Sequence, residues 1–170
     1  MSRAINENIL WNIEQIALFL AEAKEKPINQ RSRYYKASFL FIASVIEALL
    51  FMIIKKYHSS HKIEYRCEYE YKQLCQLSNK LFKSTSGQIG IYDKKELDFE
   101  LNEKIGLQSM NQIGFKYKLF DKRVYNKIDK IRRKRNRIHL QSLSEKDHRY
   151  TKRNVEYAAS VLLKIINIPR

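Results

Sequence analysis

Residues 32–57, SRYYKASFLFIASVIEALLFMIIKKY, decide the fold of this chain. In the segment 37–54, fifteen of eighteen residues are apolar, and the exceptions are Ser38, Ser44 and Glu47. A helix that is apolar on every side has to be buried, either in a protein core or in a membrane. We therefore take this stretch as the centre around which the other elements pack.

The same stretch also has the layout of a transmembrane span, because basic residues flank the apolar run on both sides. Glu47 would then lie near the middle of the bilayer, which costs about 3 kcal/mol for an acidic side chain on insertion scales. The rest of the chain also offers amphipathic helices that need an apolar partner. We predict a buried central helix and no membrane association, with a transmembrane helix as the alternative.

Glu47 needs an explanation of its own within so apolar a helix. A buried carboxylate is costly unless it meets a cation or hydrogen-bond donors. The arginines of residues 132–137 are the candidates. Alternatively, Glu47 lies near one end of the helix assembly and reaches water.

A second stretch, residues 124–140 (VYNKIDKIRRKRNRIHL), combines helical periodicity with dense positive charge. Arg135 occupies a position where the apolar stripe requires a core residue, and His139 follows one turn later. The helical repeat also brings neighbouring polar residues to this side, so we expect one patch to contain four residues: Arg132, Arg135, Asn136 and His139. Further charge surrounds the patch at Lys130, Arg133, Lys134 and Arg137.

The remaining segments mostly read as helices. Residues 2–26 have an apolar face at the helical period, and Pro27 ends that helix. A last helix has Thr151 as its N-cap. Residues 63–71 alternate as a strand would, but we favour a helix over 68–83, because an isolated strand has no pairing partner.

Residues 84–118 contain all four glycines of the protein and predict a loop-rich insertion with a short helix over 94–105. With no second strand predicted, the sequence indicates an all-α fold in a single domain, 1–170. We expect an antiparallel helical bundle of four to five core helices. The irregular insertion separates its third helix from the late arginine-rich helix.

The composition favours a polyanionic partner and a reducing compartment. Lys and Arg number 33 against 18 Asp and Glu, a formal net charge of +15, which is typical of proteins that bind RNA, DNA or anionic surfaces. Cys67 and Cys75 form no CxxC pair, and together with His58 and His61 they give no tight metal-ligand pattern. The first residues carry acids and lack an uninterrupted apolar core, so we expect no signal peptide and a cytoplasmic location. We predict no metal and no cofactor.

Three segments together resemble the HEPN superfamily of helical RNA-binding and RNA-cleaving domains. These are an apolar helix with an acidic residue (SFLFIASVIEALL), a late helix with an Arg-polar-His motif (IRRKRNRIHL) and a closing apolar helix (NVEYAASVLLKII). The family motif places His four to six residues after Arg, with a polar residue directly after the Arg. Here Arg135-Asn136 stands three residues before His139, whereas the longer spacings are met by Arg132 and Arg133. The helical face favours Arg132 and Arg135 for the family role.

The resemblance implies a metal-independent endoribonuclease. His139 would take the proton from a ribose 2′-OH, and attack on the adjacent phosphate would leave a 2′,3′-cyclic phosphate and a 5′-OH end. Arg135 or Arg132 would stabilise charge on the phosphate oxygens, Asn136 would orient the phosphate or the imidazole, and Glu47 would support the site. The RNA would be bound by Lys130, Arg133, Lys134 and Arg137. Efficient RNA cleavage uses two proton-transferring groups, and one His supplies only one of them. We therefore expect a homodimer in which two motifs face one cleft, as in HEPN-like proteins. A toxin or phage-defence role with an antitoxin partner is implied in the same way.

Two other interpretations compete with the nuclease. A HEPN-like module could bind RNA without cutting it, since basic residues alone supply sequence-independent affinity. Alternatively, the helix at 132–137 could enter a DNA groove, although no helix-turn-helix pattern precedes it.

Overall fold

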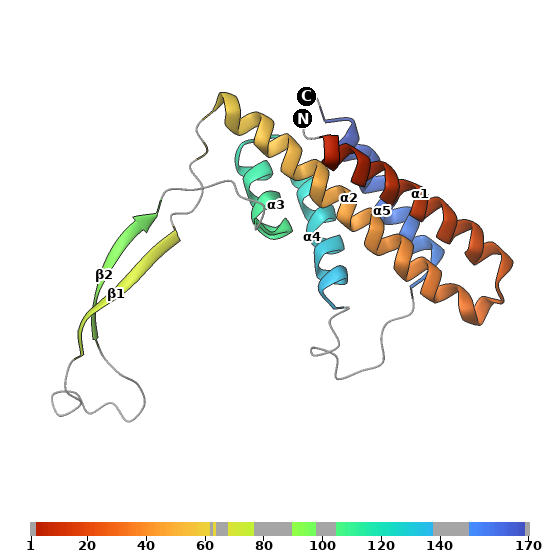
Figure 1. Ribbon diagram of the computed structural model, residues 1–170, viewed down its shortest axis with the longest axis horizontal. Coiled ribbons are helices and arrows are strands. Elements are labelled where there is room, and N and C mark those ends of the chain that lie inside the picture. The colour runs from red at the N-terminus through yellow and green to blue at the C-terminus, as the bar shows by residue number, and fades with distance from the viewer. Residues whose placement is uncertain are drawn as a thin grey trace. The chain divides into compact units, whose positions relative to one another are not determined.

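The computed structural model divides the chain into two compact units, Met1–Ser60 with Lys104–Arg170, and His61–Glu103. It describes residues 3–61, 63, 68–76, 90–97, 105–137 and 150–168. The first unit is helical, and the second contains a pair of strands (Figure 1). The prediction of a mainly helical fold is confirmed.

The first two helices form a hairpin. Helix α1 spans Arg3–Glu25, and α2 spans Arg31–Ser60. Between them, Pro27 is extended (φ −55°, ψ 150°) and precedes a short 3-10 helix, η1, at Ile28–Gln30. Pro27 has no N–H to donate, so the predicted end of the first helix at this residue has a direct physical reason.

Helix α2 is the central element of the helical unit, as its composition predicts. It packs against α1, α3, α4 and α5, and Figure 1 shows the length over which α1 and α5 accompany it. Its core residues include Phe39, Ile42, Ile46, Leu50 and Ile54, each with at most 1% of its surface exposed. A helix with this many packing partners needs apolar residues on several of its sides.

Helix α3, Leu107–Lys116, belongs to the helical unit, although the sequence placed these residues in a loop-rich insertion. A Cβ at Gly114 would overlap the Phe120 ring, so this glycine lets the ring lie directly on the helix backbone. Asn111 is buried, and its Nδ2 donates to the backbone carbonyl of Tyr125 on α4 at 3.0 Å. These contacts fasten α3 to the chain that follows it.

Helices α4 and α5 complete the unit. Helix α4 spans Lys122–Asn136, and α5 spans Lys152–Ile166. The predicted N-cap of the last helix is confirmed at Thr151, whose N–H donates to Oδ1 of Asn154 at 3.0 Å. This bond gives a helix-end N–H a partner.

The second unit corrects two predictions. Strands β1, Glu68–Gln76, and β2, Gly90–Leu97, pair antiparallel, from Glu68 opposite Leu97 to Gln76 opposite Gly90. The helix predicted over 68–83 is therefore wrong at 68–76, and the helix predicted over 94–105 is wrong at 94–97. The alternation in 63–71 was the correct signal for β1, and the missing partner strand lies fourteen residues further along the chain. Residues 77–83 and 84–89 lie outside the described residues.

One helical segment of the described chain, Ile28–Ser60, is long and apolar enough to cross a membrane. Half of its most apolar window is buried inside the protein. The core helix of a soluble protein passes the same test of length and composition, so this finding is weak evidence for a span.

Candidate functional site: the arginine-rich end of α4

The candidate site is built on α4, which carries eight Lys or Arg residues and a single Asp. Its N-terminus is capped by Asp121, whose Oδ1 accepts a hydrogen bond from the N–H of Val124 at 2.7 Å. Arg133, Lys134 and Arg135 form its last turn. Positive charge at a helix C-terminus interacts favourably with the helix dipole, so this end tolerates a cluster of cations.

Arg135 forms an ion pair with Glu47 of the central helix. Its Nη1 donates to Oε2 of Glu47 at 2.6 Å, and the two side chains are 34% and 28% exposed. The two residues are 88 positions apart in sequence. The expectation that an arginine of 132–137 neutralises Glu47 is confirmed, and the other expectation, that Glu47 reaches water, holds in part. The bond uses one of the five N–H donors of the guanidinium.

Arg132 and Arg133 are both held by Asp129, a residue that the sequence argument did not include. Oδ1 of Asp129 accepts from Arg132 Nε at 2.9 Å and lies 2.8 Å from Arg132 Nη2, and Oδ2 forms an ion pair with Arg133 Nε at 2.8 Å. The signal was present in the sequence, because an Asp three and four residues before an Arg lies beside it on a helix. The carboxylate therefore orients the guanidinium of Arg132, which is 19% exposed, and forms an ion pair with the exposed Arg133.

Lys134 lies against two aromatic rings. Its Nζ is 4.6 Å from the Tyr150 ring centroid and 6.0 Å from that of Phe39. Burial lowers the pKa of Lys134 below its usual value, and the charges of Lys130 and Arg137 lower it further. The Tyr150 hydroxyl also donates to the backbone carbonyl of Lys134 at 3.2 Å.

Tyr150 ties the site to the central helix and was missed by the sequence argument. It is 3% exposed, its ring packs 5.4 Å from that of Phe39, and its N–H donates to Ser32 Oγ at 2.9 Å. The available signal was an aromatic residue directly before the N-cap of the last helix, a position that commonly packs against the structure it enters.

The other predicted site residues that the structure describes are exposed. Lys130 is exposed and lies 5.0 Å from the ring centroid of Tyr157 on α5, where burial raises the pKa of the phenol. Asn136 and Arg137 are exposed at the end of α4. The positive charge of Lys164 on α5 lowers the pKa of Lys127, a residue of α4 that the sequence argument did not name.

The structure therefore brings together some of the predicted residues. Arg135 meets Glu47, and Arg132 meets Arg133 at Asp129. His139 lies outside the described residues, so the predicted convergence of Arg132, Arg135, Asn136 and His139 stays a prediction. Within the described part of the chain, no group of three or more His, Cys, Asp or Glu residues is placed to hold a metal ion.

Comparison with protein-family models, curated proteins and solved structures finds no match. The resemblance to the HEPN superfamily accordingly depends on the residues of this chain alone. The observations that bear on function are the charge of α4, the carboxylates that orient its arginines and the aromatic residues beside its lysines.

Proposed function

We propose that this protein is a metal-independent endoribonuclease of the HEPN type, acting on RNA in the cytoplasm. In this proposal the helical unit is an antiparallel bundle, and residues 61–103 are an insertion into it. The observation that carries the proposal is the ion pair between Glu47 and Arg135. It holds Arg135 against the acidic residue of the central helix, as the need of a buried carboxylate for a countercharge predicts.

The chemistry follows from the residue types. His139 removes the proton from a ribose 2′-OH, and the resulting oxygen attacks the adjacent phosphorus. The bond from phosphorus to the 5′-oxygen breaks, which leaves a 2′,3′-cyclic phosphate and a 5′-oxygen that takes up a proton. Arg135 stabilises the charge that develops on the phosphate oxygens, and Glu47 holds its guanidinium in one orientation beforehand. Asn136 and Arg132 are the further groups proposed to contact the phosphate.

The surrounding cations would bind the RNA backbone. Lys130, Arg133 and Arg137 are exposed around the end of α4, where phosphates can reach them. Such contacts release counterions when RNA binds. A plot of the logarithm of the association constant for single-stranded RNA against the logarithm of the salt concentration should therefore have a slope of about −0.7 for each phosphate neutralised. Lys134 contributes less in this proposal, because two aromatic rings already contact its ammonium group.

Cleavage also needs a proton donor for the leaving oxygen, and we propose that a second copy of the chain supplies it. Four residues of α1 support a homodimer by their spacing of three, four and three: Leu10, Ile13, Ala17 and Leu20. In an antiparallel pair of α1 helices, Leu10 of each copy meets Leu20 of the other. Leu10 is 61% exposed and Ile13 is 42% exposed, so this side of α1 has apolar surface left to cover.

The dimer is tested by molar mass in solution. Leu10→Glu should halve the mass measured by light scattering. Leu163→Glu, a change at a leucine of similar exposure (59%) on α5, should leave it unchanged. A wild-type protein that stays monomeric at assay concentration contradicts the homodimer.

The nuclease is tested by incubating the protein with end-labelled single-stranded RNA in EDTA. Wild type should yield cyclic-phosphate ends, and His139→Ala and Arg135→Gln should lose this product. The matched control is Arg123→Gln, which removes an exposed charge at the opposite end of the same helix. Undiminished cleavage by His139→Ala would mean that the activity belongs to another site or to a contaminant.

A non-catalytic RNA-binding module is the second candidate, and one observation favours it. Asp129 and Glu47 already neutralise Arg132, Arg133 and Arg135 in part, which weakens them as transition-state electrophiles but leaves them as positioned phosphate contacts. Salt-sensitive binding without any cleavage by wild type would establish this candidate.

If cleavage is found, we further propose a toxin or phage-defence effector restrained by an antitoxin protein, since a free ribonuclease harms its host. Growth arrest on expression that is relieved by His139→Ala would test this role.

A further inference from the structure

A cavity of about 730 Å³ opens in the helical unit beside the C-terminal half of α2. Its walls come from α1, α2, α5 and the connection between α3 and α4, and the apolar side chains among them include Ile5, Met52, Ile53, Leu119, Ile165 and Ile168. The volume lies within the usual range of small-molecule sites, about 300–1,000 Å³. A concave site with predominantly apolar walls is suited to an apolar ligand body.

Three lysines also line this cavity: Lys55, Lys56 and Lys118. All three are exposed, and no Asp or Glu is among the described residues that line the cavity. Within the part of the chain that the structure describes, no carboxylate forms an ion pair with any of them. The cavity therefore offers apolar walls together with positive charge that the described residues leave uncompensated.

Lys118 holds an unusual backbone conformation at this site, with φ at 55°. It follows the end of α3, where the N–H of Leu119 donates to the carbonyl of Gly114 at 2.8 Å and the N–H of Lys118 to that of Phe115 at 3.1 Å. This pair of bonds is a Schellman motif, whose left-handed residue is usually glycine because a Cβ is disfavoured there. A lysine in this position carries a conformational cost that glycine would avoid, which suggests a use for its side chain.

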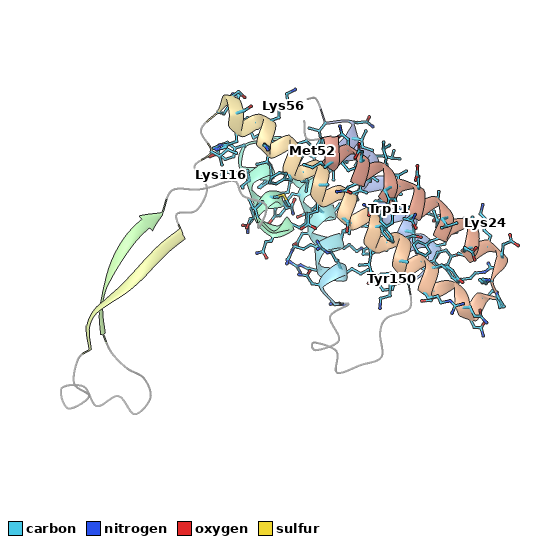
Figure 2. All side chains as sticks on the ribbon, viewed as in Figure 1. Trp11, Lys24, Met52, Lys56, Lys116 and Tyr150 are labelled. Carbon is cyan, nitrogen blue, oxygen red and sulfur yellow. The ribbon has the colours of Figure 1, made fainter. Side chains whose placement is uncertain are left out.

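The cavity is separate from the arginine-rich end of α4. Lys56 lies nine residues beyond Glu47 on α2, or about 13 Å along the helix axis. Lys134 of α4 lies against Phe39, nearer still to the start of α2. Figure 2 shows Met52 and Lys56 toward one end of the helical unit and Tyr150 well away from them. Ligand binding in the cavity is therefore independent of the proposed ribonuclease site.

We propose that this cavity binds a single amphiphilic anion, with an alkyl chain against the apolar walls and a carboxylate or phosphate head at Lys55, Lys56 and Lys118. Charge complementarity selects the head group, because the described lining of the cavity includes three lysines and no acidic residue. The concave shape favours an individual molecule over a bilayer surface, since residues from four parts of the fold line the cavity.

The binding is measured on the full chain with ¹³C-methyl methionine, using dodecanoate and dodecyl phosphate below their micellar concentrations. Met52 is a lining residue of the cavity, whereas Met110 is 1% exposed in the core and serves as the internal reference. We expect either anion to shift the Met52 signal in a saturable way and to leave Met110 in place. Binding of one anion and not the other identifies the head group and supports the proposal.

Variants separate head-group recognition from damage to the fold. Lys118→Gly should unfold at the same or a higher temperature than wild type yet bind the anion about fivefold more weakly, and Lys56→Gln should weaken binding similarly. Lys24→Gln removes a charge at the far end of α1 (Figure 2) and should leave the affinity unchanged.

Several results overturn the proposal. These are an unmoved Met52 signal, equal binding of dodecanol and dodecanoate, and equal affinity for inorganic phosphate and dodecyl phosphate. Unchanged affinity in both Lys118→Gly and Lys56→Gln also overturns it. A Met52 shift that occurs only with anionic phospholipid vesicles would assign the surface to membranes instead.

Discussion

The ion pair between Glu47 and Arg135 allows a quantitative test of how α4 is attached to the central helix. Replacing Glu47 with Gln keeps the shape of the side chain but removes the charge that faces Arg135 across 2.6 Å. Exposed ion pairs contribute about 0.2–1 kcal/mol, whereas breaking a fully buried pair costs about 3–5 kcal/mol. With side chains 28% and 34% exposed, this pair lies between those limits. We expect Glu47→Gln to lower the free energy of unfolding by about 1.5 kcal/mol.

A double-mutant cycle isolates the interaction from the separate effects of each substitution. Glu47→Gln, Arg135→Met and the double variant would be unfolded in urea and followed by helical circular dichroism. The single tryptophan, Trp11, packs 5.7 Å from Phe41 on α2, so its fluorescence reports on the same helical unit. The expected coupling energy is about 1–2 kcal/mol.

The matched control is the pair of Glu22 with Lys26. Its atoms are 3.8 Å apart and its side chains are 47% and 37% exposed, so its coupling should stay below about 0.5 kcal/mol. A coupling between Glu47 and Arg135 as small as that of the control would refute the reasoning. It would mean that Arg135 is held by the helix alone and that the central carboxylate does not orient it.

Three further predictions concern packing, a hydrogen bond and charge. Gly114→Ala should destabilise the helical unit by about 1–3 kcal/mol in urea unfolding, because the added methyl overlaps Phe120, and Phe120→Leu should restore part of the loss. Tyr150→Phe should cost about 1 kcal/mol through the lost hydrogen bond to a carbonyl of α4, and an unchanged unfolding midpoint would contradict that bond. Lys164→Gln should raise the pKa of Lys127, measured by NMR of its Nζ group, and should stabilise the fold more at low salt than at high salt. Because the folded-state pKa of Lys127 is lowered, wild type should gain stability relative to Lys164→Gln as the pH rises through that value toward 10.5, and a flat difference would count against the repulsion.

The sequence correctly predicted the helices that are marked by apolar periodicity or by a residue that begins or ends a helix. The apolar run of residues 37–54 correctly indicated the central helix, because only a helix with partners on several sides can bury every face. Pro27 and Thr151 marked helix boundaries through their own backbone chemistry. The arginine at the missing apolar position correctly indicated a countercharge in the core helix, since an unpaired cation there is costly.

The strands show where local reading failed. The alternation before residue 71 was correct for β1, but pairing depends on β2, which lies beyond a stretch of unrelated sequence. No local rule reveals a partner at that distance. The helix over 68–83 was favoured because an isolated strand has no pairing partner, and β2 is that partner.

The sequence by itself determined the charge of this protein, its central helix and the set of residues that we propose for a phosphate site. Only the tertiary structure decided which of those residues meet. Arg135 reaches Glu47 across 88 positions, and Tyr150 packs on Phe39 and Lys134, because these pairs are set by the packing of whole helices. The cavity beside Lys118 belongs to the same category, since its walls come from segments near both ends of the chain. Periodicity tells which face of a helix is buried, but the identity of the neighbour follows from how all the helices share one core.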